Sequence, residues 1–244
     1  MKKCIVTMLA VAITTLFSGC VTVNFGAGGN MVLGKGDLKS TEYNVGAYTA
    51  VDIRTGMELI YSEEVSDKVV IEIQENLIEY LDVRVENGVL IVDTKNPINT
   101  GSKDPKIYIS NPDLSKISVS GFIIMSDCDK ISGESFVLEV FGAAEIEAEF
   151  DVDELHINGS GAVNMDLSGR ADTADINISG AGAIEAMELQ TKSAFVAISG
   201  TGDVEISCSD NLDVDISGAG SVVYRGDPKV TQNTGGIATI KKEK

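Results

Sequence analysis

The segment Ile176-Asn-Ile-Ser-Gly180 decides the fold, because versions of it return at Val196-Ala-Ile-Ser-Gly200 and Val214-Asp-Ile-Ser-Gly218. Three earlier segments align with it, at 117–121, 138–142 and 155–159. Apolar and polar residues mostly alternate before each glycine, which is the pattern of a strand that ends in a tight turn. This segment therefore marks each copy of an internal repeat.

The glycines that end the six segments lie 21, 17, 21, 20 and 18 residues apart. In the last four segments a second glycine follows two positions on, at Gly161, Gly182, Gly202 and Gly220. A repeat near 20 residues that contains strand patterns and no helical pattern is typical of a solenoid of strands. The sequence predicts an all-β, single-stranded parallel β-helix with one coil per repeat.

Strand parity predicts how each coil packs. Apolar residues four and two positions before the first glycine, such as Ile176 and Ile178, share one face, as do Ile184 and Ala186 beyond the second glycine. Stacked coils would join these positions into an elongated core, with the glycines at a sharp corner. A phosphate-binding loop is excluded, because such a loop opens a helix. An antiparallel sandwich stays open, because alternation is common to both folds.

The region from Tyr43 to Lys95 also alternates with period two, and Asn87-Gly88 marks a hairpin turn. Residues 75–81 could form one helical turn, and residues 96–105, with two prolines, read as a loop. These strands and hairpins are expected to pack on the β-helix or to continue it.

The N-terminus has the features of an export signal: Lys2 and Lys3 precede an apolar run from Ile5 to Phe17 that is too short to span a bilayer. The run closes on Phe17-Ser-Gly-Cys20, which resembles the lipobox of bacterial lipoproteins, with Phe17 in place of the usual aliphatic residue. The resemblance implies that Cys20 is lipidated and anchors the chain in the membrane. A plain secretory signal with a chance cysteine is the alternative.

Four regions are expected along the chain. They are a lipoprotein signal peptide at 1–19, the lipidated cysteine with a glycine-rich flexible tether at 20–36, an N-terminal β-strand part at 37–115, and the Gly-x-Gly coils with a C-terminal cap at 116–244.

Charge limits the partners of the mature chain. Once residues 1–19 are removed, 17 Lys and Arg stand against 37 Asp and Glu, a formal charge of −20. A surface of this sign repels nucleic acid. The lipid anchor places the protein in the cell envelope, in the outer membrane, and leaves open whether it faces the periplasm or the cell surface.

Several motifs together resemble the GIN domain, a family labelled as auto-transporter adhesin heads, over about residues 45 to 240. They are Tyr48-Thr-Ala-Val-Asp-Ile, Asn87-Gly-Val-Leu-Ile-Val, Asn111-Pro-Asp-Leu-Ser-Lys-Ile-Ser-Val-Ser-Gly121, the Ser-Gly-x-Gly coils and Gly226-Asp-Pro. The chain departs from the pattern at residues 122–124 and 143–144, where the second glycine is missing. The resemblance implies a right-handed parallel β-helix in secreted or lipid-anchored proteins, and it brings no ligand and no catalytic motif.

Histidine and cysteine offer little chemistry. The single histidine, His156, lies in an outward column and reads as a solvated surface residue. Cys128 and Cys208 fall four coils apart, or about 19 Å at about 4.8 Å per coil, too far for a disulfide. We expect two separate thiols, both buried.

Carboxylates are plentiful, and one outward column is expected to read Ser126, Glu147, Asn164, Glu185, Glu205, Val223. Glu185 and Glu205 would be neighbours across coils, an unfavourable pair unless a cation bridges them. No cofactor is expected, and calcium at Glu185 and Glu205 is kept as a hypothesis, although calcium needs six to eight oxygens.

No enzyme is expected, because Arg170 and Arg225 are isolated among acidic residues and the sequence shows no paired acid and base in a cleft. The favoured function is a non-enzymatic envelope lipoprotein that displays a rigid β-helix to a glycan or cell-surface protein, in the manner of an adhesin. A carbohydrate-binding or polysaccharide-processing module and an envelope structural protein are the alternatives.

The chain ends in a charged stretch that contains Lys241, Lys242 and Lys244. Such charges oppose strand pairing between molecules, so a monomer is favoured.

Overall fold

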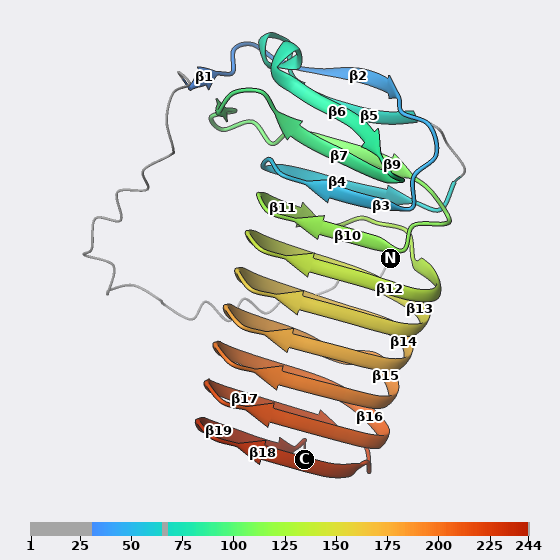
Figure 1. Cartoon of the computed structure of the whole chain (residues 1–244), viewed down its shortest axis with the longest axis vertical. Coiled ribbons are helices and arrows are strands. Elements are labelled where there is room, and N and C mark those ends of the chain that lie inside the picture. The colour runs from blue at the N-terminus through green and yellow to red at the C-terminus, as the bar shows by residue number, and fades with distance from the viewer. Residues whose placement is uncertain (1–30, 65–67, 244) are drawn as a thin grey trace, which may run out of the picture.

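The computed structural model describes residues 31–64 and 68–243. The expected signal peptide, Cys20 and most of the expected tether lie outside the described residues. The described chain is all-β, a solenoid of about 7 stacked parallel turns (Figure 1). None of its helices is long and apolar enough to cross a membrane, within the residues described.

Ten strands build the regular coils. They are β10 (Lys116–Val119), β11 (Phe122–Met125), β12 (Ile131–Val140), β13 (Ala143–Gly159), β14 (Ala162–Ile178), β15 (Ala181–Ile198), β16 (Thr201–Ile216), β17 (Ala219–Arg225), β18 (Lys229–Thr234) and β19 (Ile237–Lys242). Each pairs in parallel with the strand one coil away, so that Ile157, Ile176, Val196 and Val214 lie side by side. The β-helix prediction is confirmed, and the parallel pairing rules out the antiparallel sandwich.

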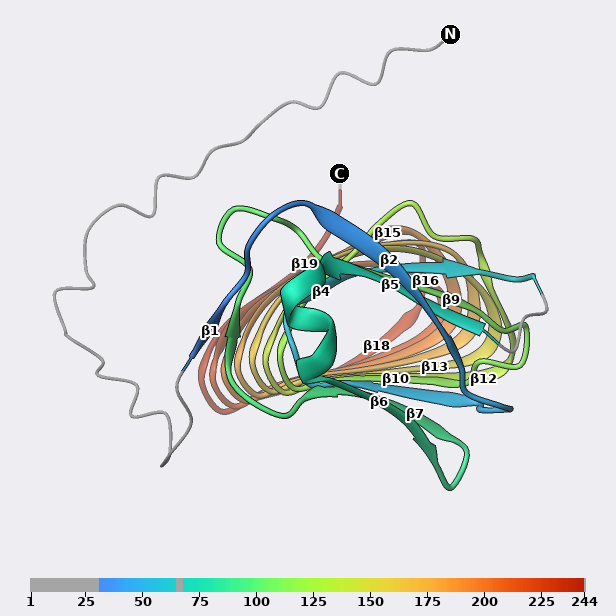
Figure 2. The same ribbon diagram turned by 90° about the horizontal axis from the view of Figure 1, so that it is seen from above.

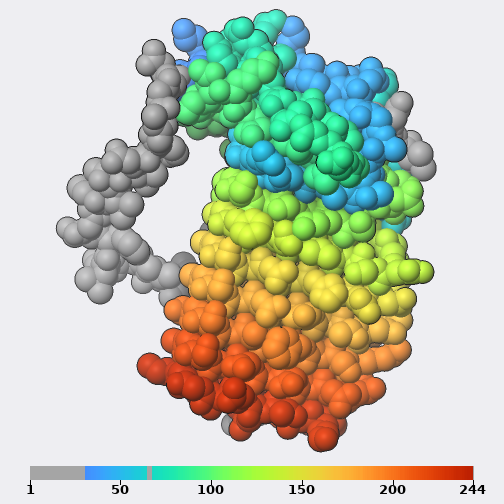
Figure 3. Space-filling view, in the orientation of Figure 1, coloured from blue at the N-terminus to red at the C-terminus, as the bar shows by residue number. Residues whose placement is uncertain are grey.

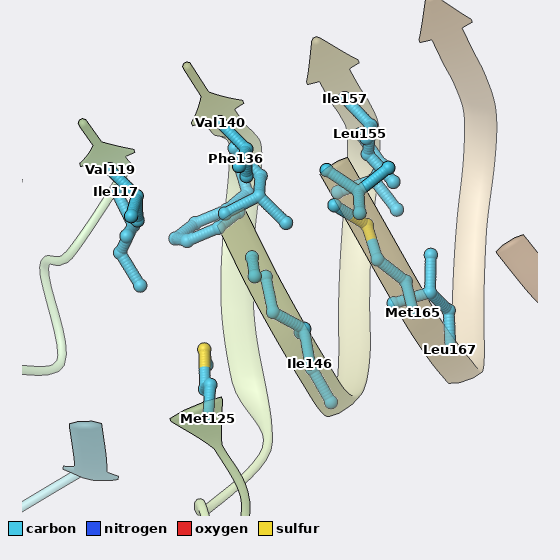
Figure 4. Close-up of a cluster of buried hydrophobic side chains, with 14 of the residues drawn as sticks. Ile117, Val119, Met125, Phe136, Val140, Ile146, Leu155, Ile157, Met165 and Leu167 are labelled. Carbon is cyan, nitrogen blue, oxygen red and sulfur yellow. The ribbon is translucent and has the colours of Figure 1, made fainter. Parts of the chain in front are cut away.

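Inward side chains from every coil form one continuous core. Ile117, Leu138, Ile157 and Ile176 stack in register, and each is at most 1% exposed. Figure 4 shows Ile146, Leu155 and Met165 pointing into the space that the coils enclose. Full burial of such a side chain stabilises the fold by about 1.5–3 kcal/mol. Seen as a space-filling surface, the coils form successive bands along the long axis (Figure 3).

The N-terminal part continues and then closes the solenoid. Its elements are β1 (Val32–Leu33), β2 (Leu38–Asn44), β3 (Ala50–Ile53), β4 (Met57–Ser62), β5 (Lys68–Gln74), the 3-10 helix η1 (Glu75–Tyr80), β6 (Leu81–Glu86), β7 (Val89–Thr94), β8 (Ile98–Asn99) and β9 (Lys106–Ser110). Strands β3 and β4 pair in parallel with β10 and β11, which extends the coils. Antiparallel pairs β2–β5 and β6–β7, with η1, cover this end (Figure 2).

The sharpest constraint on the coils is a corner where glycines stack. One glycine from each coil lies directly on the glycine of the coil before it, in the order Gly121, Gly142, Gly161, Gly180, Gly200, Gly218, Gly236. A Cβ built on Gly180 would lie 2.0 Å from the carbonyl oxygen of Gly161, and one on Gly161 would lie 1.7 Å from that of Gly142. No side chain fits this contact, so the corner demands glycine.

The register corrects one part of the sequence alignment. Gly159 was expected to match Gly142, but Gly159 pairs with Val140 and Gly161 takes the corner. Gly161 is therefore not equivalent to Gly182, which pairs with Val163. A shift of two residues preserves which side chains point inward, and the alternation of apolar residues could not reveal it.

The last residues of the expected tether are docked on the closed end. Val32 and Leu33 pair with Ile98 and Asn99, inside the region expected to be a loop. The Asn76 side chain accepts a hydrogen bond from the Lys35 amide at 2.7 Å and donates one to the Leu33 carbonyl at 2.9 Å. Main-chain and side-chain hydrogen bonds hold residues 32–35 in place. The prediction that the tether is flexible as far as residue 36 is therefore wrong for these four residues.

Replacing Gly180 with alanine should destabilise the solenoid, because the new Cβ meets backbone oxygens at 2.0 and 2.5 Å. Overpacking typically costs about 1–3 kcal/mol, and backbone atoms cannot rotate away. The urea midpoint of Gly180→Ala measures this loss. Gly235→Ala is the matched control, since a Cβ on Gly235 meets nothing within 4 Å. Equal midpoints for the two variants would contradict the corner constraint.

Alkaline pH should weaken the fold through buried acids near the closed end. Burial raises the pKa of Cys128 to about 11 and the pKa of Tyr48 and Tyr61 to about 12, from ordinary values of 9.0 and 10.0. The neutral forms favour the folded state, so their contribution is complete below pH 9 and is lost as pH rises toward 12. Urea midpoints across this range should fall, and less steeply in Tyr48→Phe. An unchanged slope in that variant would count against a role for Tyr48.

Candidate ligand-binding groove

The few basic residues of the central coils meet in one place. Between residues 131 and 228 the only lysine and arginine residues are Arg170, Lys192 and Arg225. They come from β14, β15 and β17, and all three line a groove of about 680 Å³. Arg170 and Arg225 were predicted to be isolated, and this was wrong. We call this region the basic groove.

An irregularity in β15 opens the basic groove. Ala186 pairs with Ile206, but the next pair is Gln190 with Ser207, so residues 187–189 have no partner in β16, although Glu188 and Leu189 still pair with β14. A bulge leaves residues unpaired and bends the strand locally. At the other rim Gly226 turns the chain with φ of 108°, where a Cβ would lie 2.1 Å from the Cys208 carbonyl oxygen.

Arg225 ties three coils together at the edge of the basic groove. Its Nε donates to a Glu243 carboxylate oxygen at 2.5 Å, and Nη1 donates to the main-chain oxygen of Met187 in the bulge at 3.2 Å. The Glu188 carboxylate lies 3.5 Å from the same Nη1. Its bond to Glu243 raises the pKa of Arg225 and lowers the pKa of Glu243. The guanidinium therefore stays charged and held in place.

Arg170 and Lys192 share one carboxylate on the opposite rim. Asp172 accepts hydrogen bonds from Arg170 Nη2 at 2.6 Å and from Lys192 Nζ at 2.9 Å, and Arg170 Nη1 also reaches Asp151 at 3.3 Å. The Lys192 bond, followed by the Arg170 bond, lowers the pKa of Asp172. Asp172 is thus an ionised acceptor.

The floor of the basic groove is polar but internally satisfied. Thr191 is 6% and Cys208 is 3% exposed. The Thr191 hydroxyl donates to the Ser207 carbonyl oxygen at 2.7 Å, and the Ser207 hydroxyl donates to Met187 O at 2.6 Å. The Cys208 thiol donates to Asn211 O at 3.1 Å. The charged groups that line the groove are Arg170, Lys192, Arg225, Asp172, Glu188 and Asp227.

The calcium candidates lie elsewhere, on an outward column. Glu185 and Glu205 are exposed and pair in register, as expected. The observed column differs from the predicted one at a single position, where Asp166 replaces Asn164. Asp166 pairs with both Glu147 and Glu185, while Asn164 pairs with Glu145. This error follows from the misplaced corner glycine. In the described part of the chain, no group of three or more His, Cys, Asp or Glu is arranged to hold a metal ion.

His156 lies on the surface, 3.6 Å from Glu154 and 3.7 Å from Asp175, with its side chain 38% exposed. Cys128 and Cys208 are free thiols in different coils, with Cys208 buried and Cys128 partly buried. Cys20 lies outside the described residues.

Most of the solenoid matches a known family. The model of the family described as "Putative auto-transporter adhesin, head GIN domain" matches residues 47–228. The chain belongs to the GIN domain family. The resemblance found in the sequence is thereby confirmed.

Solved structures support the same fold. A "putative adhesin" from Bacteroides fragilis is 22% identical with a TM-score of 0.78, covering 87% of this chain and 100% of its own. A "putative lipid binding protein" and a "putative adhesin" from Parabacteroides distasonis are 22% and 20% identical, with TM-scores of 0.70 and 0.67; each comparison covers 88% of this GIN domain protein and 100% of the other chain. At such identities the likeness shows the fold. No curated protein matched the chain.

Removing the Arg225 side chain should loosen the last coil. Arg225→Ala loses the bonds to Met187 in β15 and to Glu243 beyond β19. Because these ion pairs are solvent-exposed, we expect little change in global stability. Amide exchange in β17 and β19 should nevertheless become faster, while exchange in β13 stays unchanged. Unchanged exchange in both regions would show that Arg225 does not hold the coils.

Proposed function

We propose that this GIN domain protein is a non-enzymatic, lipid-anchored outer membrane protein that displays a rigid solenoid and binds a surface partner through the basic groove. The observation that carries the proposal is the convergence of Arg170, Lys192 and Arg225 on one groove of an otherwise acidic solenoid. The family description and the similar adhesin structures favour a role at the cell envelope or surface.

The place where the chain joins the solenoid supports an anchored display. The first described residues, Met31 to Leu33, lie at the closed end, and Met31 stands 11 positions after Cys20. An extended chain spans at most about 3.6 Å per residue, so this stretch reaches no more than about 40 Å. A lipid on Cys20 would keep the closed end toward the membrane and direct the later coils, with the basic groove, away from it.

The chemistry of the basic groove supports binding and not catalysis. A general acid at neutral pH needs a raised pKa. The pKa of Asp172 is instead lowered by Lys192 and Arg170, and Glu188 lies beside Arg225. These carboxylates are suited to accept hydrogen bonds.

The last coil supports a monomer. Strands β18 and β19 pair with β16 and β17 on one side only, among the described residues. Lys241 and Lys242 on β19 charge this open edge, and Lys242 forms an ion pair with Asp227 at 2.5 Å. Charged side chains on an edge strand oppose strand pairing between molecules.

Protease shaving of intact cells tests the display. We expect the solenoid to be digested while periplasmic marker proteins survive, as judged by immunoblotting of the envelope fraction. Protection of the solenoid would contradict surface exposure.

Cys20→Ala tests the anchor, because it removes the thiol that would carry the lipid. We expect this variant to lose labelling by a radioactive fatty acid and to leave the membrane fraction. Cys128→Ala is the matched control and should remain membrane-bound. A Cys20→Ala variant that stays labelled would overturn the lipid anchor.

A further inference from the structure

We propose that the basic groove binds a short, uncharged oligosaccharide. This inference rests on the proposed function in one respect, that the basic groove is the binding site, and it adds the chemical class of the ligand.

The balance of charge at the rim favours an uncharged ligand. Three cations, Arg170, Lys192 and Arg225, face three carboxylates, Asp172, Glu188 and Asp227. An anion near Arg170, Lys192 or Arg225 would lie close to the carboxylates that already bind them, Asp172 at 2.6 and 2.9 Å and Glu243 at 2.5 Å, and these would repel it. The formal charge of −18 on the chain adds a repulsive field for any polyanion.

A cationic ligand is disfavoured for the reciprocal reason. Asp172 already accepts bonds from Arg170 and Lys192, and Glu188 lies 3.5 Å from Arg225. A new cation near these carboxylates would meet the three resident positive charges.

Sugar hydroxyls can use the rim without breaking its ion pairs. A guanidinium has five N–H donors and a carboxylate about four lone-pair sites, more than a single ion pair engages. Arg170 and Asp172 therefore present donors and acceptors side by side, as neighbouring hydroxyls of a sugar ring require. Hydrogen bonds to charged groups are stronger than those between neutral groups.

The size and lining of the groove suit an oligosaccharide. Its volume of about 680 Å³ lies within the usual range of about 300–1,000 Å³ for small-molecule sites. It extends from β14 across β15 and β16 to the end of β17, so it has the length for more than one ring. Met187 in the bulge is partly buried and offers a soft apolar contact to the C–H face of a sugar.

A glycan array probed with the purified full-length chain tests the inference, with uncharged oligosaccharides beside sialylated, uronate and sulfated ones. We expect hits confined to uncharged glycans, with little dependence on salt because no ligand charge is screened. Arg170→Gln and Asp172→Asn should each weaken binding of the best hit by about tenfold or more, the equivalent of about 1.4 kcal/mol.

Lys116→Gln is the matched control, since Lys116 pairs with Glu139 at 2.8 Å outside the groove. It should bind like the unchanged chain. Urea midpoints of all variants must match, which separates loss of binding from loss of folding.

Three outcomes would overturn the inference: hits confined to anionic glycans, hits that survive both groove variants, and an array with no hits. The shaving experiment is separate. If the solenoid is digested on intact cells and the array shows no hits, surface display is supported and oligosaccharide binding is rejected. If the solenoid is protected from protease and uncharged glycans bind in a way that depends on Arg170, oligosaccharide binding is supported and surface display is rejected.

Discussion

The contact between corner glycines sets the geometry of the whole solenoid. The Gly161 carbonyl oxygen occupies the space that a Cβ on Gly180 would need, and the same holds for Gly180 and Gly200. Strand hydrogen bonds set a spacing of about 4.8 Å between coils, and glycine lets the backbones keep that spacing at the corner. The register of Ile157, Ile176 and Val196, and thus the continuity of the core, depends on that spacing.

Outside the core, the distribution of charge distinguishes two kinds of surface. The column through Asp166, Glu185 and Glu205 brings carboxylates into register across coils, where like charges repel. In the basic groove each cation is met by a carboxylate, and the shared Asp172 binds two of them. The first surface repels anions, and the second offers matched donors and acceptors.

The sequence predicted the fold more fully than the site. Period-two alternation and recurring Ser-Gly segments were enough for a parallel β-helix, since inward parity survives an error of two residues. That same tolerance hid the true partner of Gly142, which is Gly161, and with it the place of Asp166 in the acidic column. The basic groove was missed because only the register shift between Ala186 and Gln190 puts Arg170 and Arg225 in one column, through Gln190 and Ser207. The one available signal was that the central coils contain no lysine or arginine besides these two and Lys192.

The rigid corner also determines where such proteins can vary in length. A side chain at the stacked glycines would collide with backbone atoms of the neighbouring coil, whereas another part of the coil accommodates residues 187–189 and leaves Val196 paired with Val214. Coils can therefore be lengthened on one side without disturbing their neighbours. That side is where new recognition loops could be grafted or selected, and the corner would serve as the fixed spine that carries them.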